Sequence, residues 1–95
     1  MPFEALAKQG YPMFMYYAYI LRSETYSQYY YGSTSDLQKR LRAHNAGTSS
    51  HTAKFRPWTI VWYGAFETKV QAEAFEHYLK SASGKAFLRK RLVHK

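Results

Sequence analysis

Cysteine is absent from this chain of 95 residues. Its absence excludes disulfide bonds, thiolate metal sites and a cysteine nucleophile. No apolar run approaches the roughly 18 residues that a membrane-spanning helix needs. The first residues contain an acid, Glu4, and lack the apolar core of a signal peptide. The sequence therefore predicts a soluble, cytoplasmic protein.

Acidic residues are scarce, with 6 Asp and Glu against 14 Lys and Arg, so the formal net charge is +8. Such a charge favours a polyanionic partner, either a nucleic acid or an anionic membrane surface. A basic protein that is merely soluble is the plain alternative. Aromatic residues, by contrast, are abundant at 19%, and ten of them are tyrosines, which combine apolar surface with a polar tip.

The length of the chain fits one domain with one modest core. Pro2, Gly10 and Pro12 interrupt any helix near the N-terminus. We therefore expect residues 1–14 to form a flexible arm and residues 15–95 to form the folded domain.

Six elements are predicted from hydrophobic patterning within this domain. Strands are expected over residues 16–21, 28–33 and 58–66, and helices over 36–46, 69–81 and 85–93. Ser35 is the expected N-cap of the first helix and Gly47 its end, whereas Thr68 and Gln71 form a capping box before the second helix. Residues 47–54 are predicted to be a polar, mobile loop. Three strands cannot close a barrel, so we expect an α+β fold: a small antiparallel or mixed three-stranded sheet flanked by helices, in the order β-β-α-β-α-α.

The helices carry polar residues close to their predicted apolar faces. On the first helix, Leu37 and Leu41 define the buried stripe, and Arg40 and His44 lie on one flank of it. On the second helix, Glu76 lies at the boundary of the buried arc. That arc is predicted to contain Val70, Ala74, Phe75, Tyr78 and Leu79.

Taken singly, these polar residues have plain explanations. A strand tyrosine is usually a packing residue, and Glu76 could pair with Lys80 on the same helix face. His44 could interact favourably with the helix C-terminus. Composition and periodicity alone thus predict a basic α+β domain that binds nucleic acid.

The order and spacing of these residues are more specific than any one of them. Tyr17-Ala18-Tyr19 is followed by Tyr30-Tyr31-Gly32, then by Arg40 and His44, and far downstream by Glu76. This series resembles the GIY-YIG nuclease superfamily, and most of all its small stand-alone bacterial members. The resemblance extends from about Met15 to the C-terminus.

Several roles are implied by the resemblance. Tyr19 and Tyr30 would be the two site tyrosines, Arg40 the helix arginine, His44 the frequent histidine one turn later, and Glu76 the metal-binding glutamate. The family pattern is not matched everywhere. Ser33 replaces a lysine of the excision-repair members, and an asparagine found in some members after the glutamate helix has no match.

The implied function is a divalent-metal-dependent endonuclease that hydrolyses phosphodiester bonds in DNA. Glu76 would hold Mg²⁺ or Mn²⁺, because a single carboxylate with waters and phosphate suits these hard ions. Arg40 would grip the phosphate and Tyr30 would orient the water or phosphate. Tyr19 would activate the water, with Arg40 and the metal lowering its ordinary pKa of about 10 and His44 relaying the proton.

Substrate recognition is predicted to rest on basic and polar side chains that contact the nucleic-acid backbone. These candidates are Lys39, His51, Lys54, Arg56, Lys85 and Arg89. No recognition helix or zinc-finger spacing is present, so we expect selection by DNA structure rather than by sequence, as in repair or recombination.

Two alternatives remain open at this point. The chain could be a non-catalytic nucleic-acid-binding module of the same fold, or an interaction protein whose tyrosines serve only a core or a dimer interface. The sequence also leaves open an RNA substrate, a protein partner that supplies specificity, and the choice between a monomer and a weak homodimer.

Overall fold

The structure of the protein is a computed structural model that describes residues 14–91. Its elements are β1 (Tyr16–Ser23), β2 (Tyr29–Thr34), α2 (Leu37–Ala46), α3 (Ser50–Ala53), β3 (Trp58–Phe66), α4 (Lys69–Leu79) and α5 (Ala82–Arg91). Apart from Phe14, the predicted N-terminal arm lies outside the described residues. Within residues 14–91, no helix combines the length and apolar character that crossing a bilayer requires.

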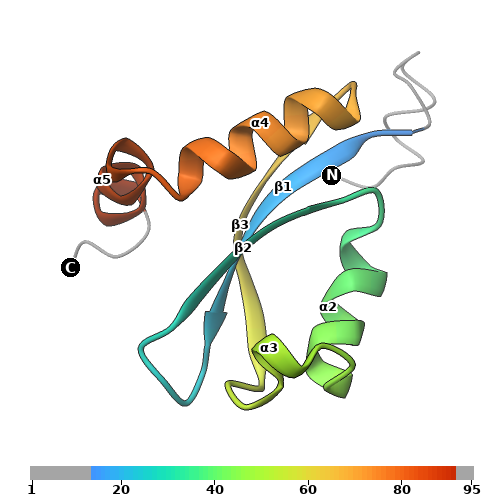
Figure 1. The fold of residues 1–95 in the computed structure, drawn as a ribbon, viewed down its shortest axis with the longest axis vertical. Coiled ribbons are helices and arrows are strands. Elements are labelled where there is room, and N and C mark those ends of the chain that lie inside the picture. The colour runs from blue at the N-terminus through green and yellow to red at the C-terminus, as the bar shows by residue number, and fades with distance from the viewer. Residues whose placement is uncertain (1–13, 92–95) are drawn as a thin grey trace.

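The three strands form one antiparallel sheet with the order β2-β1-β3. Helix α4 covers one face of this sheet, and α2 and α3 lie on the other (Figure 1). The α+β class, the small sheet and the order β-β-α-β-α-α are therefore confirmed, with the short helix α3 as an addition. The sheet is wholly antiparallel.

Strand β1 is buried on both faces because it lies in the middle of the sheet with helices on either side. Alternate side chains of a strand point to opposite faces. Ala18 and Ile20 pack in the core on the α4 side, whereas Tyr19 and Leu21 pack with Trp58 on the α2 side. Strict alternation along residues 16–21 likewise predicts Tyr19 and Leu21 on one face and Ala18 and Ile20 on the other.

Helix α2 begins one residue later than predicted. Its N-cap is Asp36, whose carboxylate accepts a hydrogen bond from the Lys39 backbone N–H at 3.0 Å. The predicted cap, Ser35, is wrong, because the Thr34 hydroxyl accepts from the Asp36 backbone N–H at 3.1 Å and keeps Asp36 outside the first turn. Gly47 ends the helix at φ 79, as predicted.

The prediction of a mobile loop over residues 47–54 is wrong in its second half, which forms α3. Thr52 in this helical turn is only 2% exposed. Its backbone carbonyl accepts a hydrogen bond from Trp58 Nε1 at 3.0 Å. The Asn45 side chain exchanges two further hydrogen bonds with the Trp58 backbone, which hold the end of α2 against β3.

Helix α4 starts with the predicted capping box of Thr68 and Gln71. Its predicted buried arc is partly wrong, since Val70, Ala74 and Tyr78 are exposed. The side chains that are buried or half-buried follow the spacing i, i+3, i+4, i+7: Ala72, Phe75, Glu76 and Leu79. Hydrophobicity alone favoured the wrong arc, whereas contact with the sheet selects a stripe that includes Glu76.

Helix α5 starts at Ala82 rather than at the predicted Lys85, and Gly84 lies inside it. A Cβ at Gly84 would collide with the backbone of Tyr78 and Leu79. Glycine at this position therefore lets α5 pack tightly against the end of α4, and it does not interrupt the helix.

Candidate active site

Tyr19 is placed by its position opposite Gly32 in the β1–β2 pairing. A Cβ at Gly32 would lie 2.5 Å from the Tyr19 hydroxyl and 2.6 Å from its Cζ. The phenol therefore occupies the space that any larger residue at position 32 would fill. Glycine at position 32 therefore allows the close approach of the Tyr19 side chain.

A chain of buried hydrogen bonds starts at this phenol. The Tyr19 hydroxyl lies 3.2 Å from His44 Nε2, and His44 Nδ1 lies 2.9 Å from the Thr52 hydroxyl. The exposed fractions of Tyr19, His44 and Thr52 are 1%, 4% and 2%. Side chains from β1, α2 and α3 thus form one continuous polar path inside the domain.

Tyr30 on β2 packs over this path. Its ring centroid lies 4.8 Å from that of His44 and 6.3 Å from that of Tyr19. Tyr30 is half-buried, so it is more accessible than the other two rings. The two predicted site tyrosines and the histidine therefore form one cluster on the α2 side of the sheet.

Both ends of the Tyr19–His44 hydrogen bond are held neutral. Burial raises the pKa of Tyr19 above its ordinary value, the neighbouring Tyr30 adds to this, and the Arg40 guanidinium opposes it. Burial lowers the pKa of His44, and the positive charge of Arg40 lowers it further. Arg40 acts on Tyr19 in the direction expected from the sequence, but burial outweighs it.

Glu76 lies on α4, the helix that covers the other face of the sheet, and is half-buried. Its charge contributes to the raised pKa of Tyr19. Glu76 Oε2 also accepts a hydrogen bond from Lys80 Nζ at 2.9 Å, so the plain pairing considered for this residue is present. No group of three or more His, Asp or Glu side chains that could hold a metal ion occurs within residues 14–91. A cation at Glu76 would therefore find fewer than three such side chains among the described residues.

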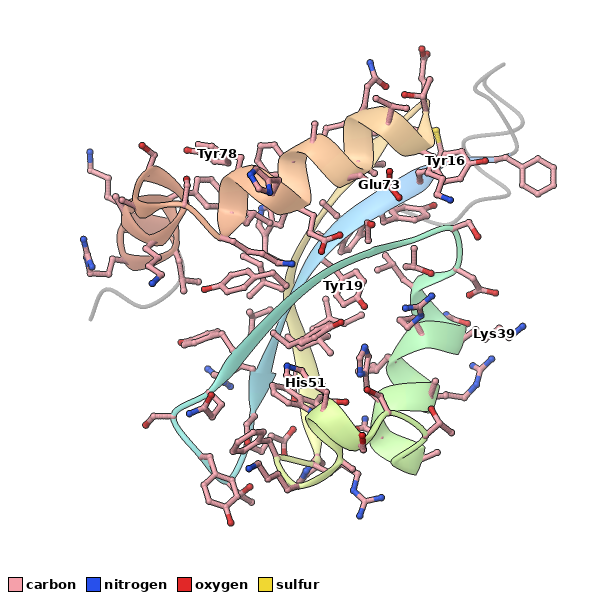
Figure 2. All side chains as sticks on the ribbon, viewed as in Figure 1. Tyr16, Tyr19, Lys39, His51, Glu73 and Tyr78 are labelled. Carbon is pink, nitrogen blue, oxygen red and sulfur yellow. The ribbon has the colours of Figure 1, made fainter. Side chains whose placement is uncertain are left out.

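Arg40 is exposed and borders a pocket of about 470 Å³ between the β2–α2 turn and the first turns of α4. The other polar groups of its lining are those of Tyr16, Ser33, Thr34, Ser35, Lys69 and Glu73. Glu73 lies beneath α4, beside Tyr16 (Figure 2). The guanidinium thus connects the buried cluster to a solvent-open cavity.

Comparison with protein families identifies the domain. Residues 15–91 match the GIY-YIG catalytic domain. The chain belongs to the GIY-YIG family. The UPF0213 protein CPE1444 of Clostridium perfringens is 39% identical over 67 residues, which are 70% of this chain and 71% of that protein. The UPF0213 protein HQ_3675A of Haloquadratum walsbyi is 36% identical over 67 residues, with 70% and 74% covered. Both UPF0213 relatives are thus matched over about seven tenths of their own length as well as of this chain.

A larger protein also matches this GIY-YIG chain. The structure-specific endonuclease subunit SLX1 of Scheffersomyces stipitis is 46% identical over 71 residues, which are 65% of this chain but 21% of that protein. Among solved structures, the solution structure of the UPF0213 protein BH0048 from Bacillus halodurans is 29% identical, with a TM-score of 0.48, and covers 80% of this chain and 83% of its own.

The residues predicted to bind nucleic acid are all exposed, but they do not form one surface. Lys39 points outward from α2, and His51 lies on α3 (Figure 2). Lys54 and Arg56 follow α3, whereas Lys85 and Arg89 are on α5. Helix α5 lies at the far side of the domain from α2 and α3 (Figure 1). A nucleic acid at the cluster would therefore meet the α2–α3 group first.

Sequence reasoning missed three residues around the site. Thr52 was placed in a polar loop, and neither Lys69 nor Glu73 was assigned to the site. The i, i+4 spacing from Lys69 to Glu73 is visible in the sequence, but its position beside Arg40 is not. Thr52 has no local signal, because its burial depends on His44 and Trp58 from other elements.

Proposed function

We propose that this GIY-YIG protein is an endonuclease that hydrolyses phosphodiester bonds in DNA and needs a divalent metal ion. The observation that supports it is the gathering of Tyr19, Tyr30 and His44 in one cluster within electrostatic reach of Arg40 and Glu76. These five residues come from four different elements. Packing of a core does not require two phenols, an imidazole, a guanidinium and a carboxylate to meet.

Arg40 is the proposed phosphate-binding residue. Its guanidinium faces a solvent-open pocket and acts electrostatically on both Tyr19 and His44. A planar guanidinium can donate two parallel hydrogen bonds to one phosphate, which fixes orientation as well as position. A phosphodiester gripped there would lie next to the Tyr19 hydroxyl.

Tyr19 and His44 are proposed to move the proton of the attacking water. With its pKa raised, Tyr19 is neutral and is not a preformed base. His44 is also neutral and has one unprotonated ring nitrogen. As the water oxygen bonds to phosphorus, the bond from phosphorus to the 3′ oxygen breaks, and solvent water protonates the leaving oxygen. The Tyr19 oxygen takes the proton of the attacking water, and its own proton passes to His44 Nε2. Tyr30 would orient the phosphate from its more accessible position.

Glu76 is the proposed metal ligand, with Mg²⁺ or Mn²⁺ as the ion. One carboxylate, with water and phosphate oxygens completing the coordination, fits the ligand preferences of these ions. Such an ion, when bound, supplies positive charge for the leaving 3′ oxygen. Lys80 has to release Glu76 Oε2 for this, and the pair is partly exposed, with 52% of the Lys80 side chain accessible.

We further propose that the substrate is recognised by its structure rather than by its sequence. The exposed basic side chains of α2 and α3 suit backbone phosphates, which carry no sequence information. SLX1, named as a structure-specific endonuclease subunit, supports this preference by similarity. Two alternatives can be tested in the same assay: a protein partner could supply the specificity, and RNA could be the substrate.

The test is cleavage of branched, nicked and single-stranded DNA in Mg²⁺, Mn²⁺ or EDTA. Wild type should cut in either metal and not in EDTA. Glu76→Gln should lose at least about a hundredfold in rate, because it removes the proposed ligand. Glu67→Gln is the matched control, since Glu67 is an exposed acid just before α4 and its loss changes the charge equally. Equal cleavage by both variants would disprove the role of Glu76.

A second candidate function is a non-catalytic nucleic-acid-binding module. The Glu76–Lys80 ion pair favours it, because the carboxylate already has a cationic partner. Tyr19→Phe separates the two functions. A nuclease should lose cleavage with this change and keep its DNA affinity, whereas a binding module shows affinity without cleavage in every metal, in wild type as well.

A further inference from the structure

The pocket beside Arg40 extends well beyond the catalytic cluster. Arg40 is the one predicted site residue that lines it, and its far wall is formed by the first two turns of α4, through Lys69 and Glu73. A volume of about 470 Å³ falls within the range of ligand pockets in proteins. The hydrolysis proposed above uses only the edge of this space.

The lining is suited to an anion. Arg40 and Lys69 supply two positive charges, and Glu73 supplies one negative charge. Lys69 Nζ and Glu73 Oε2 are 4.0 Å apart with 72% and 53% of their side chains exposed, so their pairing is weak. The hydroxyls of Ser33 and Ser35 add neutral hydrogen-bond donors. The net charge of the lining is therefore positive.

We propose that this pocket binds the phosphate adjacent to the scissile one on the same nucleic-acid strand, with Lys69 as its principal cation. The inference rests on the proposed function, because Arg40 is shared by the two phosphates. A second anchored phosphate would fix the direction of the strand across the site, which a single contact at Arg40 leaves free. Glu73 opposes this binding and moderates its strength.

The test measures binding of a fluorescein-labelled single-stranded oligodeoxynucleotide by anisotropy, in EDTA, over a range of salt concentrations. Lys69→Ala should weaken binding about three- to tenfold and reduce the log–log salt slope by about 0.7, which is the contribution of one single-strand phosphate. Glu73→Gln should strengthen binding. The matched control is Lys90→Ala, which removes the same charge from an exposed position on α5.

Opposite effects at Lys69 and Glu73, with a smaller effect at Lys90, support the pocket. Equal losses for Lys69→Ala and Lys90→Ala would overturn it, because net charge alone then explains binding wherever the lysine lies. The assay does not depend on cleavage, so failure of the nuclease proposal leaves it interpretable. Inorganic phosphate is the second probe. If it displaced the oligonucleotide when its concentration equalled that of the oligonucleotide's phosphates, the pocket would bind free phosphate as well as a strand, and the strand-binding role would be overturned.

A second inference rests on the buried hydrogen bonds of Thr52. Two arrangements of the protons satisfy the distances along the path. If the Thr52 hydroxyl donates to the Ser49 carbonyl, 3.5 Å away, its oxygen accepts the proton of His44 Nδ1, and Nε2 accepts from Tyr19. If Thr52 instead donates to Nδ1, then Nε2 carries the proton and donates to Tyr19.

We infer that Thr52 is a positioning residue that selects the first arrangement. Only an unprotonated Nε2 can receive the proton of Tyr19 in the proposed hydrolysis, so this inference also rests on that function. Thr52 is 2% exposed, and its hydroxyl lies 2.9 Å from His44 Nδ1, so it would act on the reaction through His44. A hydroxyl on α3 thereby sets which nitrogen of an α2 histidine is the acceptor.

Nitrogen-15 NMR of the His44 ring tests this directly, because it distinguishes the two neutral tautomers without any cleavage. Wild type and Thr52→Ser should show the proton on Nδ1, whereas Thr52→Val should show a mixture. Cleavage should fall about tenfold in Thr52→Val and return in Thr52→Ser. This loss is smaller than the roughly hundredfold or greater contribution of a group that transfers the proton itself, because Thr52 only positions that group. A proton on Nε2 in wild type would overturn the inference, and that measurement holds even if Thr52→Val does not fold.

Discussion

The two faces of the sheet are built from the same central strand but follow different rules. On the α4 side, Ala18 and Ile20 are buried with Leu79 and Leu88, under a layer of aromatic rings. On the α2 side, the buried core includes Tyr19, and it is joined by polar side chains. All three buried polar side chains of the described residues lie on this side: Ser23, His44 and Thr52.

The two faces should therefore respond differently to substitution. Apolar contacts are tolerant, because side chains of similar volume can replace one another at small cost. A buried hydrogen-bonded path is not, since removing one partner leaves another polar group unsatisfied, at about 1–3 kcal/mol. We therefore expect substitutions in the apolar core on the α4 side to change mainly the free energy of unfolding. Substitutions in the buried polar path on the α2 side should change the site as well.

The largest effect on stability is expected for Leu88→Ala on α5. Leu88 is a buried member of the α4-side core, and truncating such a residue costs about 2–5 kcal/mol through lost transfer energy and the cavity left behind. Denaturant titration measures this loss. Cleavage per folded molecule should be unchanged, because α5 packs on α4 away from the tyrosine cluster. A parallel fall in the activity of the folded fraction would contradict the separation of the faces.

Two glycines give a sharper comparison. A Cβ at Gly32 meets the Tyr19 hydroxyl at 2.5 Å, and a Cβ at Gly64 meets Trp62 Cη2 at 2.8 Å on the α4 side. Both substitutions to alanine overpack a core and should cost about 1–3 kcal/mol. Only Gly32→Ala displaces Tyr19 from His44, so it should also reduce cleavage about a hundredfold, as a 1 Å misplacement can.

Cleavage rates and unfolding curves of the two glycine variants, measured side by side, check this. Similar stabilities with an activity loss confined to Gly32→Ala would show that the phenol position matters. Equal activity losses would show that the α4 face also controls the site, and the comparison would fail.

A smaller effect concerns pH. Burial, followed by the charge of Arg40, lowers the pKa of His44 from its ordinary 6.5. Below pH 6.5 the unfolded chain therefore binds a proton more readily than the folded protein, and the free energy of unfolding falls as the pH drops. His44→Gln should flatten this part of the profile in thermal or urea unfolding between pH 7.5 and the folded pKa. An unchanged slope would show that His44 is not the group responsible.

Local signals in the sequence were sufficient for most of the fold. Strand β3 has the predicted bounds, Thr68 and Gln71 form the predicted box, and Gly47 ends α2. Each of these depends on residues close together in the chain. The spacing also singled out Tyr19, Tyr30 and His44, which the structure brings together, and their catalytic roles remain a proposal.

The features that the sequence did not predict depend on contacts between different elements of the fold. Thr52 is buried because His44 and Trp58, eight and six residues away, form hydrogen bonds with it. Arg40 and Lys69 likewise line the same pocket although they belong to different helices. The periodicity of each helix does not indicate that the two residues are close together. Hydrophobicity placed Val70 in the core of α4, whereas the stripe that packs on the sheet includes a carboxylate instead.

The smallest expected effect tests that last correction. Val70 is 75% exposed, so Val70→Ala should change the free energy of unfolding by less than about 0.5 kcal/mol, with any gain coming from the better helix propensity of alanine. Phe75→Ala is the matched contrast, since Phe75 packs against Trp62 and Phe66 and its loss should cost about 2–4 kcal/mol. A core-sized cost at Val70 would mean that α4 is rotated about its axis. Glu76 would then leave the stripe that packs on the sheet, and the proposed site would lose its acid.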